Sequence, residues 1–70
     1  MFRVDFLCDV IDIAVGFKAS DMSDVYFDDG HTRRDYFDFF KYAREENKAP
    51  YVYDYHTDGN DLIIEVRYEL

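Results

Sequence analysis

The sequence contains few of the residues that cross-link, anchor or divide a chain. Cys8 is the one cysteine, so an intramolecular disulfide is excluded, and a small fold without such bonds is typical of a reducing compartment. The longest run without a charged residue has five residues, against about 20 for a membrane span, and no basic-then-apolar signal segment opens the chain. We therefore expect a cytoplasmic protein with no membrane segment.

Basic residues are also scarce: 8 Lys and Arg stand against 16 Asp and Glu, for a formal net charge of -8. This charge disfavours direct binding to nucleic acid. Yet 49% of the 70 residues are hydrophobic and 20% are aromatic, which is too apolar for a disordered acidic tail. Three glycines and one proline mark turns and form no linker, so we expect a single domain over residues 1–70.

The first 17 residues predict one long bent strand. Apolar residues occupy the even positions from Phe2 to Val10 and the odd positions from Ile11 to Phe17, a shift that a β-bulge or bend near Val10 would produce. The many β-branched residues here also favour extended structure. The alternative is a helix ending at Gly16, with an apolar stripe formed by Leu7, Val10, Ile11, Ala14 and Val15.

The middle of the chain predicts a strand followed by a helix. After a polar loop over residues 19–23, residues 24–27 form a short strand. Thr32, with an acidic residue three positions later, resembles a capping box that opens a helix over residues 33–47. Pro50 requires that helix to end before it.

The C-terminal third predicts a β-hairpin. Aromatic or aliphatic residues alternate with polar ones on both sides of Gly59, so the tyrosines and aliphatics share one face. A turn at Asp58-Gly59 keeps like charges apart, whereas a turn one residue later sets Asp54 against Glu65, which costs stability. We therefore prefer the Asp58-Gly59 turn.

Together these elements predict an α+β fold. It consists of a small antiparallel β-sheet of three to five strands, which includes the long bent N-terminal strand and the C-terminal hairpin, with one α-helix packed on its aromatic face.

Negative charge is concentrated outside the predicted helix. Residues 33–48 carry five basic and four acidic side chains, whereas the rest of the chain carries three basic and twelve acidic ones. Successive carboxylates on one strand face lie about 6.5 to 7 Å apart, close to two nucleotide steps of about 3.4 Å. The acids therefore predict a sheet face and rim that imitate a row of phosphates, although the same acids would also simply keep an aromatic-rich protein soluble. The candidate partner-binding residues fall into two groups. Asp5, Asp9, Asp54, Glu65 and Glu69 are expected on the sheet face. Asp12, Asp24, Asp28, Asp29, Asp58 and Asp61 are expected near bends and loops.

No catalytic, cofactor or metal site is expected. Cys8, His31 and His56 are too few and too scattered for zinc, and the acidic loops lack the ligand spacing of an EF-hand. No glycine-rich phosphate loop is present, and Cys8 should be buried and inert on the apolar face of the first strand. We therefore expect a protein without enzyme activity.

The partner implied is a basic nucleic-acid-binding protein or nuclease complex. In size, acidity and lack of catalytic residues, the chain resembles in general character the small phage-encoded proteins that block bacterial defence nucleases, such as anti-CRISPR and anti-restriction DNA mimics. The resemblance implies an inhibitor that acts in the host cytoplasm. The alternatives are an immunity protein or antitoxin that neutralises a basic nuclease toxin, and a small structural or adaptor subunit. A homodimer stays open, because a second copy could cover a sheet edge and surplus aromatic residues.

Overall fold

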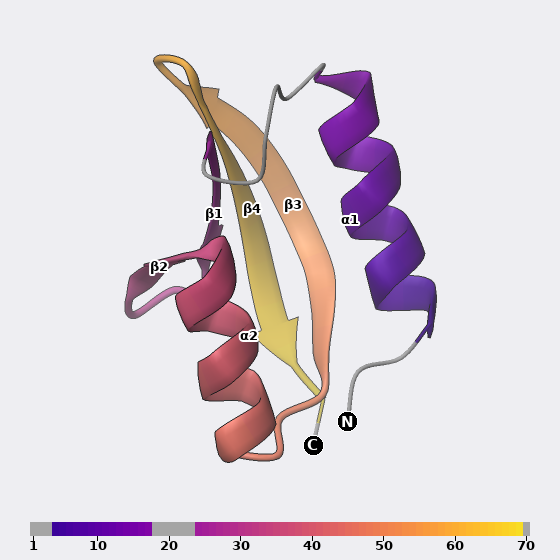
Figure 1. Cartoon of the computed structure of the whole chain (residues 1–70), viewed down its shortest axis with the longest axis vertical. Coiled ribbons are helices and arrows are strands. Elements are labelled where there is room, and N and C mark those ends of the chain that lie inside the picture. The colour runs from indigo at the N-terminus through magenta and orange to yellow at the C-terminus, as the bar shows by residue number, and fades with distance from the viewer. Residues whose placement is uncertain (1–3, 18–23, 70) are drawn as a thin grey trace.

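The computed structural model describes residues 4–17 and 24–69 of the chain. These residues form two helices and a four-stranded mixed sheet with the strand order β2-β1-β4-β3. Both helices pack on the same face of the sheet, α1 beside β3 and α2 over β1 and β2 (Figure 1). The start of the expected first strand at Phe2 and the loop expected over residues 19–23 lie outside the described residues.

The predicted α+β class, with a helix packed on a small sheet around an aromatic cluster, is confirmed. Neither of the described helices is long and apolar enough to cross a membrane. The elements are α1 (Val4–Gly16), β1 (Val25–Asp28), β2 (Arg33–Asp35), α2 (Tyr36–Glu45), β3 (Pro50–Asp58) and β4 (Asp61–Tyr68).

The first described segment is the helix α1, so the prediction of a long bent strand is wrong. Phe6, Val10 and Ala14 are four residues apart, a spacing that puts them on one side of a helix, where they are buried against the sheet. Residues four apart are also an even number of positions apart, so they would lie on one face of a strand as well. The strand pattern and the helix pattern therefore coincide here. Burial of this stripe outweighs the weak strand preference of β-branched residues. The helix ends at Gly16, as the alternative predicted.

An aromatic cluster joins both helices to the sheet. The rings of Phe27 in β1 and Phe39 in α2 stack with centroids 4.4 Å apart, and the ring of Phe6 in α1 lies 6.1 Å from that of Phe27. Ile64 and Val66 of β4 are fully buried in the same core. Full burial of one Phe side chain contributes about 1.5–3 kcal/mol, so these three rings supply much of the free energy that holds the helices on the sheet.

The sheet is mixed, where an antiparallel sheet was expected, because β1 and β4 run parallel. The connection through β2, α2 and β3 is long enough to return the chain beside β1 in the same direction. β4 is therefore a central strand, and such strands are buried on both faces. Leu62, Ile63 and Ile64 are accordingly at most 3% exposed.

The C-terminal hairpin is present, but its turn lies at Gly59-Asn60 and the preferred Asp58-Gly59 turn is wrong. Gly59 has a φ of 65°, while Asn60 is not among the residues with positive φ, which is the pattern of a type II′ turn with glycine at its first central position. The alternative turn would have required a positive φ at Asp58. The observed register sets Asp54 directly opposite Glu65, the like-charge pair that we expected the chain to avoid.

A β-bulge after Val52 divides the tyrosines of β3 between the two faces of the sheet. Tyr55 lies on the helix side, where its ring meets Phe17 edge-on at 6.0 Å. Tyr53 lies on the other side, with the guanidinium carbon of Arg67 4.5 Å from its ring centroid. The prediction that the tyrosines share one face is wrong, because the extra residue of a bulge reverses the alternation.

Helix α2 begins at Tyr36, later than the predicted start at Arg33. The preceding three residues instead form β2, which pairs antiparallel with β1. Asp35 is the N-cap, and its Oδ1 accepts a hydrogen bond of 2.8 Å from the N–H of Asp38. The helix ends at Glu45, before the proline that follows, as predicted.

Candidate protein-binding surface

The sheet face opposite the helices carries most of the acids that lie on strands. Strand pairing places Asp28 of β1, Glu65 of β4 and Asp54 of β3 side by side. Their neighbours along each strand, such as Phe27 and Ile64, belong to the core on the other face. Adjacent strands lie about 4.8 Å apart, so the three carboxylates form one row across the sheet. With the pair at the hairpin end, they make up what we call the sheet-face acids: Asp28, Asp54, Asp58, Asp61 and Glu65.

The sheet-face acids are accessible and only partly neutralised. The side chains of Asp58 and Glu65 are 64% and 29% exposed. Arg33 Nη1 lies 3.2 Å from Asp58 Oδ2, and His56 Nδ1 lies 3.4 Å from Glu65 Oε2. Arg67 on the same face packs over the ring of a tyrosine. Exposed ion pairs are weak, so this face keeps an excess of negative charge.

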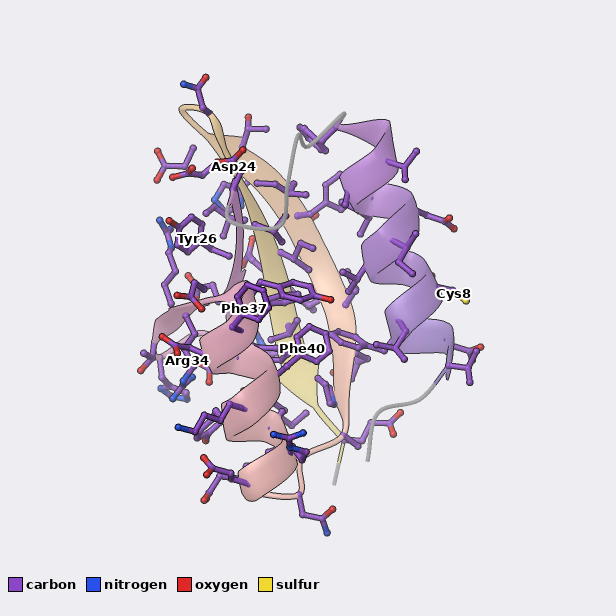
Figure 2. The ribbon with its side chains drawn as sticks, in the orientation of Figure 1. Cys8, Asp24, Tyr26, Arg34, Phe37 and Phe40 are labelled. Carbon is purple, nitrogen blue, oxygen red and sulfur yellow. The ribbon has the colours of Figure 1, made fainter. Side chains whose placement is uncertain are left out.

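Tyrosine rings lie among these acids. Tyr26 shares a row with Ile63 and His56, and Figure 2 shows Tyr26 projecting from β1 on the side away from α1. Tyr51 and Tyr53 of β3 are 44% and 63% exposed. Tyrosine is favoured at the centres of protein interfaces, because a rigid ring with a polar end buries much area for little loss of entropy. The face therefore combines charge with aromatic contact area.

Three predicted acids lie on α1, away from the sheet face. Asp5, Asp9 and Asp12 are exposed and spaced by four and then three residues, which places them along one ridge of the helix; we call them the helix-ridge acids. Asp12 lines a hollow with Phe17 and Tyr55, so the ridge lies on the side of α1 nearest β3. The prediction that Asp5 and Asp9 belong to a sheet face is wrong, because their segment is helical.

Asp29 is buried, in contrast to the other predicted acids, with an exposed fraction of 8%. Its Oδ1 accepts the N–H groups of His31 at 3.0 Å and Thr32 at 2.9 Å, and its Oδ2 accepts Arg34 Nη1 at 3.1 Å and the Tyr68 hydroxyl at 3.0 Å. Burial raises the pKa of Asp29, but these hydrogen bonds outweigh burial and lower the pKa from 3.8 to about 2. Burial and the bond to Asp29 raise the pKa of Tyr68 above its ordinary value. Asp29 therefore anchors the fold and is not part of the exposed acidic surface.

The remaining predicted residues flank the sheet. Asp24 is half-buried immediately before β1, and Glu69 is exposed immediately after β4, where its N–H donates to Ala49 O at 2.9 Å. Residues 4–17 and 24–69 contain no group of three or more His, Cys, Asp or Glu side chains arranged to hold a metal ion. Cys8, predicted to be buried, is exposed on the outer side of α1 (Figure 2).

The structure also has an exposed apolar surface that the sequence analysis did not anticipate. On α1, Val4, Ile11 and Val15 are 73%, 53% and 70% exposed, and on α2 Phe37 is 72% exposed. Between the helices lies a hollow of about 470 Å³ lined by Leu7, Phe37, Phe40, Lys41 and Arg44. The alternative helical stripe did contain residues 7, 11 and 15, together with Val10 and Ala14, which are the buried members of that stripe. We call this surface, formed by Val4, Leu7, Ile11, Val15 and Phe37, the helix-layer apolar surface.

Comparison with known proteins does not assign the chain to a family. No protein-family model, curated protein or solved structure matches it significantly. The two surfaces described above, one acidic and one apolar, are therefore the features from which function has to be argued.

Proposed function

We propose that the chain is a small acidic inhibitor that binds, through the helix-free face of its sheet, the basic nucleic-acid-binding groove of a partner protein. The observation that carries this proposal is the row formed by Asp28, Glu65 and Asp54 on three adjacent strands. Like charges directly opposite each other on neighbouring strands cost about 0.2–1 kcal/mol. The free chain bears this repulsion, and a groove lined with Lys and Arg would relieve it.

The chemistry of the face suits such a groove. Carboxylates lie about 4.8 Å apart across strands. Along β3 and β4 they are four residues apart, Asp54 from Asp58 and Asp61 from Glu65, or about 13 Å, close to four nucleotide steps of about 3.4 Å. This is a two-dimensional array of the kind that phosphates present to a nucleic-acid-binding protein. A net charge of -8 would steer association with a basic partner and make its rate fall with salt. Tyr51 and Tyr53 would supply the desolvated contacts that give the complex its lifetime.

Binding, and not catalysis, is the role that we propose. Among residues 4–17 and 24–69, the two groups with clearly shifted pKa values are Asp29 and Tyr68, and they form a hydrogen bond with each other. Groups with perturbed pKa values mark a reactive site when they face a cleft that a substrate can enter, whereas here they satisfy each other.

The finer proposal is an anti-defence protein of the anti-CRISPR or anti-restriction type, acting in a host cytoplasm. An immunity protein or antitoxin would use the same face against a basic nuclease toxin. The helix-layer apolar surface favours a second candidate, a structural or adaptor subunit, whose complex would be held by apolar contact and would therefore resist salt.

The test begins with capture on the immobilised chain from a bacterial lysate at low salt, elution by a salt gradient, and identification of the eluted proteins by mass spectrometry. Each purified partner is then bound to a labelled DNA or RNA duplex and titrated with the chain. The inhibitor proposal expects elution by salt and release of the duplex. Retention of the partner through high salt, or a duplex that stays bound, would contradict it.

Charge-reversal variants locate the contact. Asp54→Lys with Asp58→Lys changes two exposed residues of the sheet face, and Glu45→Lys with Glu46→Lys makes the same change of charge at the end of α2. We expect the first pair to weaken binding by about a hundredfold, because it reverses charges within the proposed contact. The control pair should weaken binding much less, because it changes only the long-range steering, which both pairs alter similarly. Far-UV circular dichroism would verify that both variants fold. Equal effects would mean that net charge, and not this face, governs binding.

A further inference from the structure

The helix-layer apolar surface exposes five large apolar side chains to water, each by more than a third of its area. Leu7 of α1 and Phe37 of α2 line one hollow, and Val4, Ile11 and Val15 continue the apolar stripe along α1. Residues at these spacings lie on one side of a helix, and here that side is turned away from the sheet. Contiguous exposed apolar patches on soluble proteins mark interaction sites.

Charge is arranged asymmetrically on either side of this stripe. The helix-ridge acids lie on the flank nearest β3, and Lys41 and Arg44 lie on the opposite flank, at the rim of the hollow. Within the described part of the chain, neither Lys41 nor Arg44 forms an ion pair. Because Leu7 lines the hollow together with both cations, and lies in the same helical turns as Asp5 and Asp9, the acidic and basic flanks are at the same level along α1.

We infer that this surface binds a second copy of the chain, in a two-fold dimer whose axis runs parallel to α1. Rotation about such an axis brings the acidic flank of one copy onto the basic flank of the other. It also leaves the position of every residue along the helix axis unchanged, so the two flanks meet at the same height. Asp5 and Asp9 of each copy then face Lys41 and Arg44 of the other, and each α1 lies along the α1–α2 hollow of its partner. The two α1 helices run parallel, and each runs antiparallel to the α2 that it covers, because α1 and α2 are antiparallel within one chain (Figure 1).

Two other symmetric packings would bring like charges together. A two-fold axis perpendicular to α1 sets the helix-ridge acids of one copy against those of the other. Pairing of two β3 edges would extend the sheet, but would bring together the edge strands that carry Asp54 and Asp58. Self-complementary charge therefore selects the parallel arrangement.

The test uses two variants that should fail to associate alone and should associate when mixed. The contact between residue 9 of one copy and residue 41 of the other occurs twice in the dimer. In a dimer of Asp9→Lys, both contacts set a lysine at position 9 against Lys41, which is repulsive. In a dimer of Lys41→Glu, both contacts set Asp9 against a glutamate at position 41, which is also repulsive. A mixed dimer of the two variants has one Lys–Glu contact and one Asp–Lys contact, both attractive. Sedimentation velocity over a range of concentrations measures the dissociation constant of each species, and thermal melts verify folding.

We expect a concentration-dependent dimer of the unmodified chain, about tenfold weaker association of each single variant, and recovery in the equimolar mixture. Ile11→Glu, which puts a charge in the centre of the apolar stripe at a position 53% exposed in the chain, should abolish the dimer without unfolding it. A monomer at every concentration, a dimer indifferent to Ile11→Glu, or no recovery on mixing would overturn the inference.

Discussion

Asp29 gives the sharpest prediction about stability, because a single buried carboxylate holds the turn between β1 and β2 to the end of β4. Asp29→Asn keeps the size of the side chain but removes the charge that Arg34 and Tyr68 bond to. The drop in the pKa of Asp29 from 3.8 to about 2 corresponds to about 2.5 kcal/mol of stability at neutral pH, at about 1.4 kcal/mol per pKa unit. For a domain of this size that loss lowers the Tm by about 10–20 °C.

The pH dependence of this loss follows from the direction of the shift. Because the pKa of Asp29 is lower in the folded chain than in the unfolded one, its contribution is complete above about pH 4 and disappears as the pH falls from about 4 to about 2. Urea unfolding followed by circular dichroism should therefore show a large difference between the unmodified chain and Asp29→Asn at pH 7, and a small one at the lowest pH where both fold.

Asp58→Asn is the matched control for that experiment. It removes the same charge from a side chain that is 64% exposed and bonds to Arg33 alone among the described residues. Such an exposed pair contributes at most about 1 kcal/mol. The reasoning would be refuted if Asp29→Asn cost no more than Asp58→Asn, or if its cost were the same at pH 3 as at pH 7.

Two further substitutions test the sheet face and α2. Asp54→Asn removes one charge from the acidic row but keeps the Oδ1 that accepts the Tyr55 N–H at 2.8 Å, so it should raise the free energy of unfolding by about 0.2–1 kcal/mol at low salt and by less at high salt. A loss of stability, or a gain that salt leaves unchanged, would show that the row is not repulsive. Asp35→Ala removes the N-cap acceptor of the Asp38 N–H and should cost about 1 kcal/mol in urea unfolding. An unchanged midpoint would mean that another group caps α2.

The parts of the fold that could be predicted carry strong local signals. Helix α2 has apolar residues at helical spacing and a proline beyond its end, and the hairpin has Gly59 between two alternating segments. The first segment could not be decided in this way, because Phe6 and Val10 satisfy both the strand period and the helix period. Only the complementary apolar face of the sheet, formed by residues far along the chain, selects the helix.

The candidate surface was predictable to the extent that strand alternation holds. Asp54 and Glu65 do come together on one face, as acids on alternating strand positions should. Asp28 joins them because β1 extends to it, whereas the sequence placed it in the turn after the predicted strand. The pattern cannot distinguish Asp28 from Asp29, because the burial of Asp29 depends on the Tyr68 hydroxyl 39 residues away. The pattern also cannot show that α1 has more apolar residues than the core accommodates. Which of these residues stay exposed depends on how α1 packs against the sheet.

The two proposed surfaces lie on opposite sides of the molecule, and this has a consequence for binding. A dimer formed through the helix layers would turn both acidic sheet faces outward, in opposite directions, because the two-fold axis lies within the interface. Such a dimer could engage two copies of a basic partner but not two sites on one flat surface. Its two faces would therefore act independently toward a monomeric partner, and would gain apparent affinity through avidity only where an oligomeric partner has sites that can reach both faces at once. Dissociating the dimer should consequently leave the affinity of each sheet face for a monomeric partner unchanged and should lower the number of partner molecules that one complex holds from two to one, which separates the role of the helix layer from that of the acidic row.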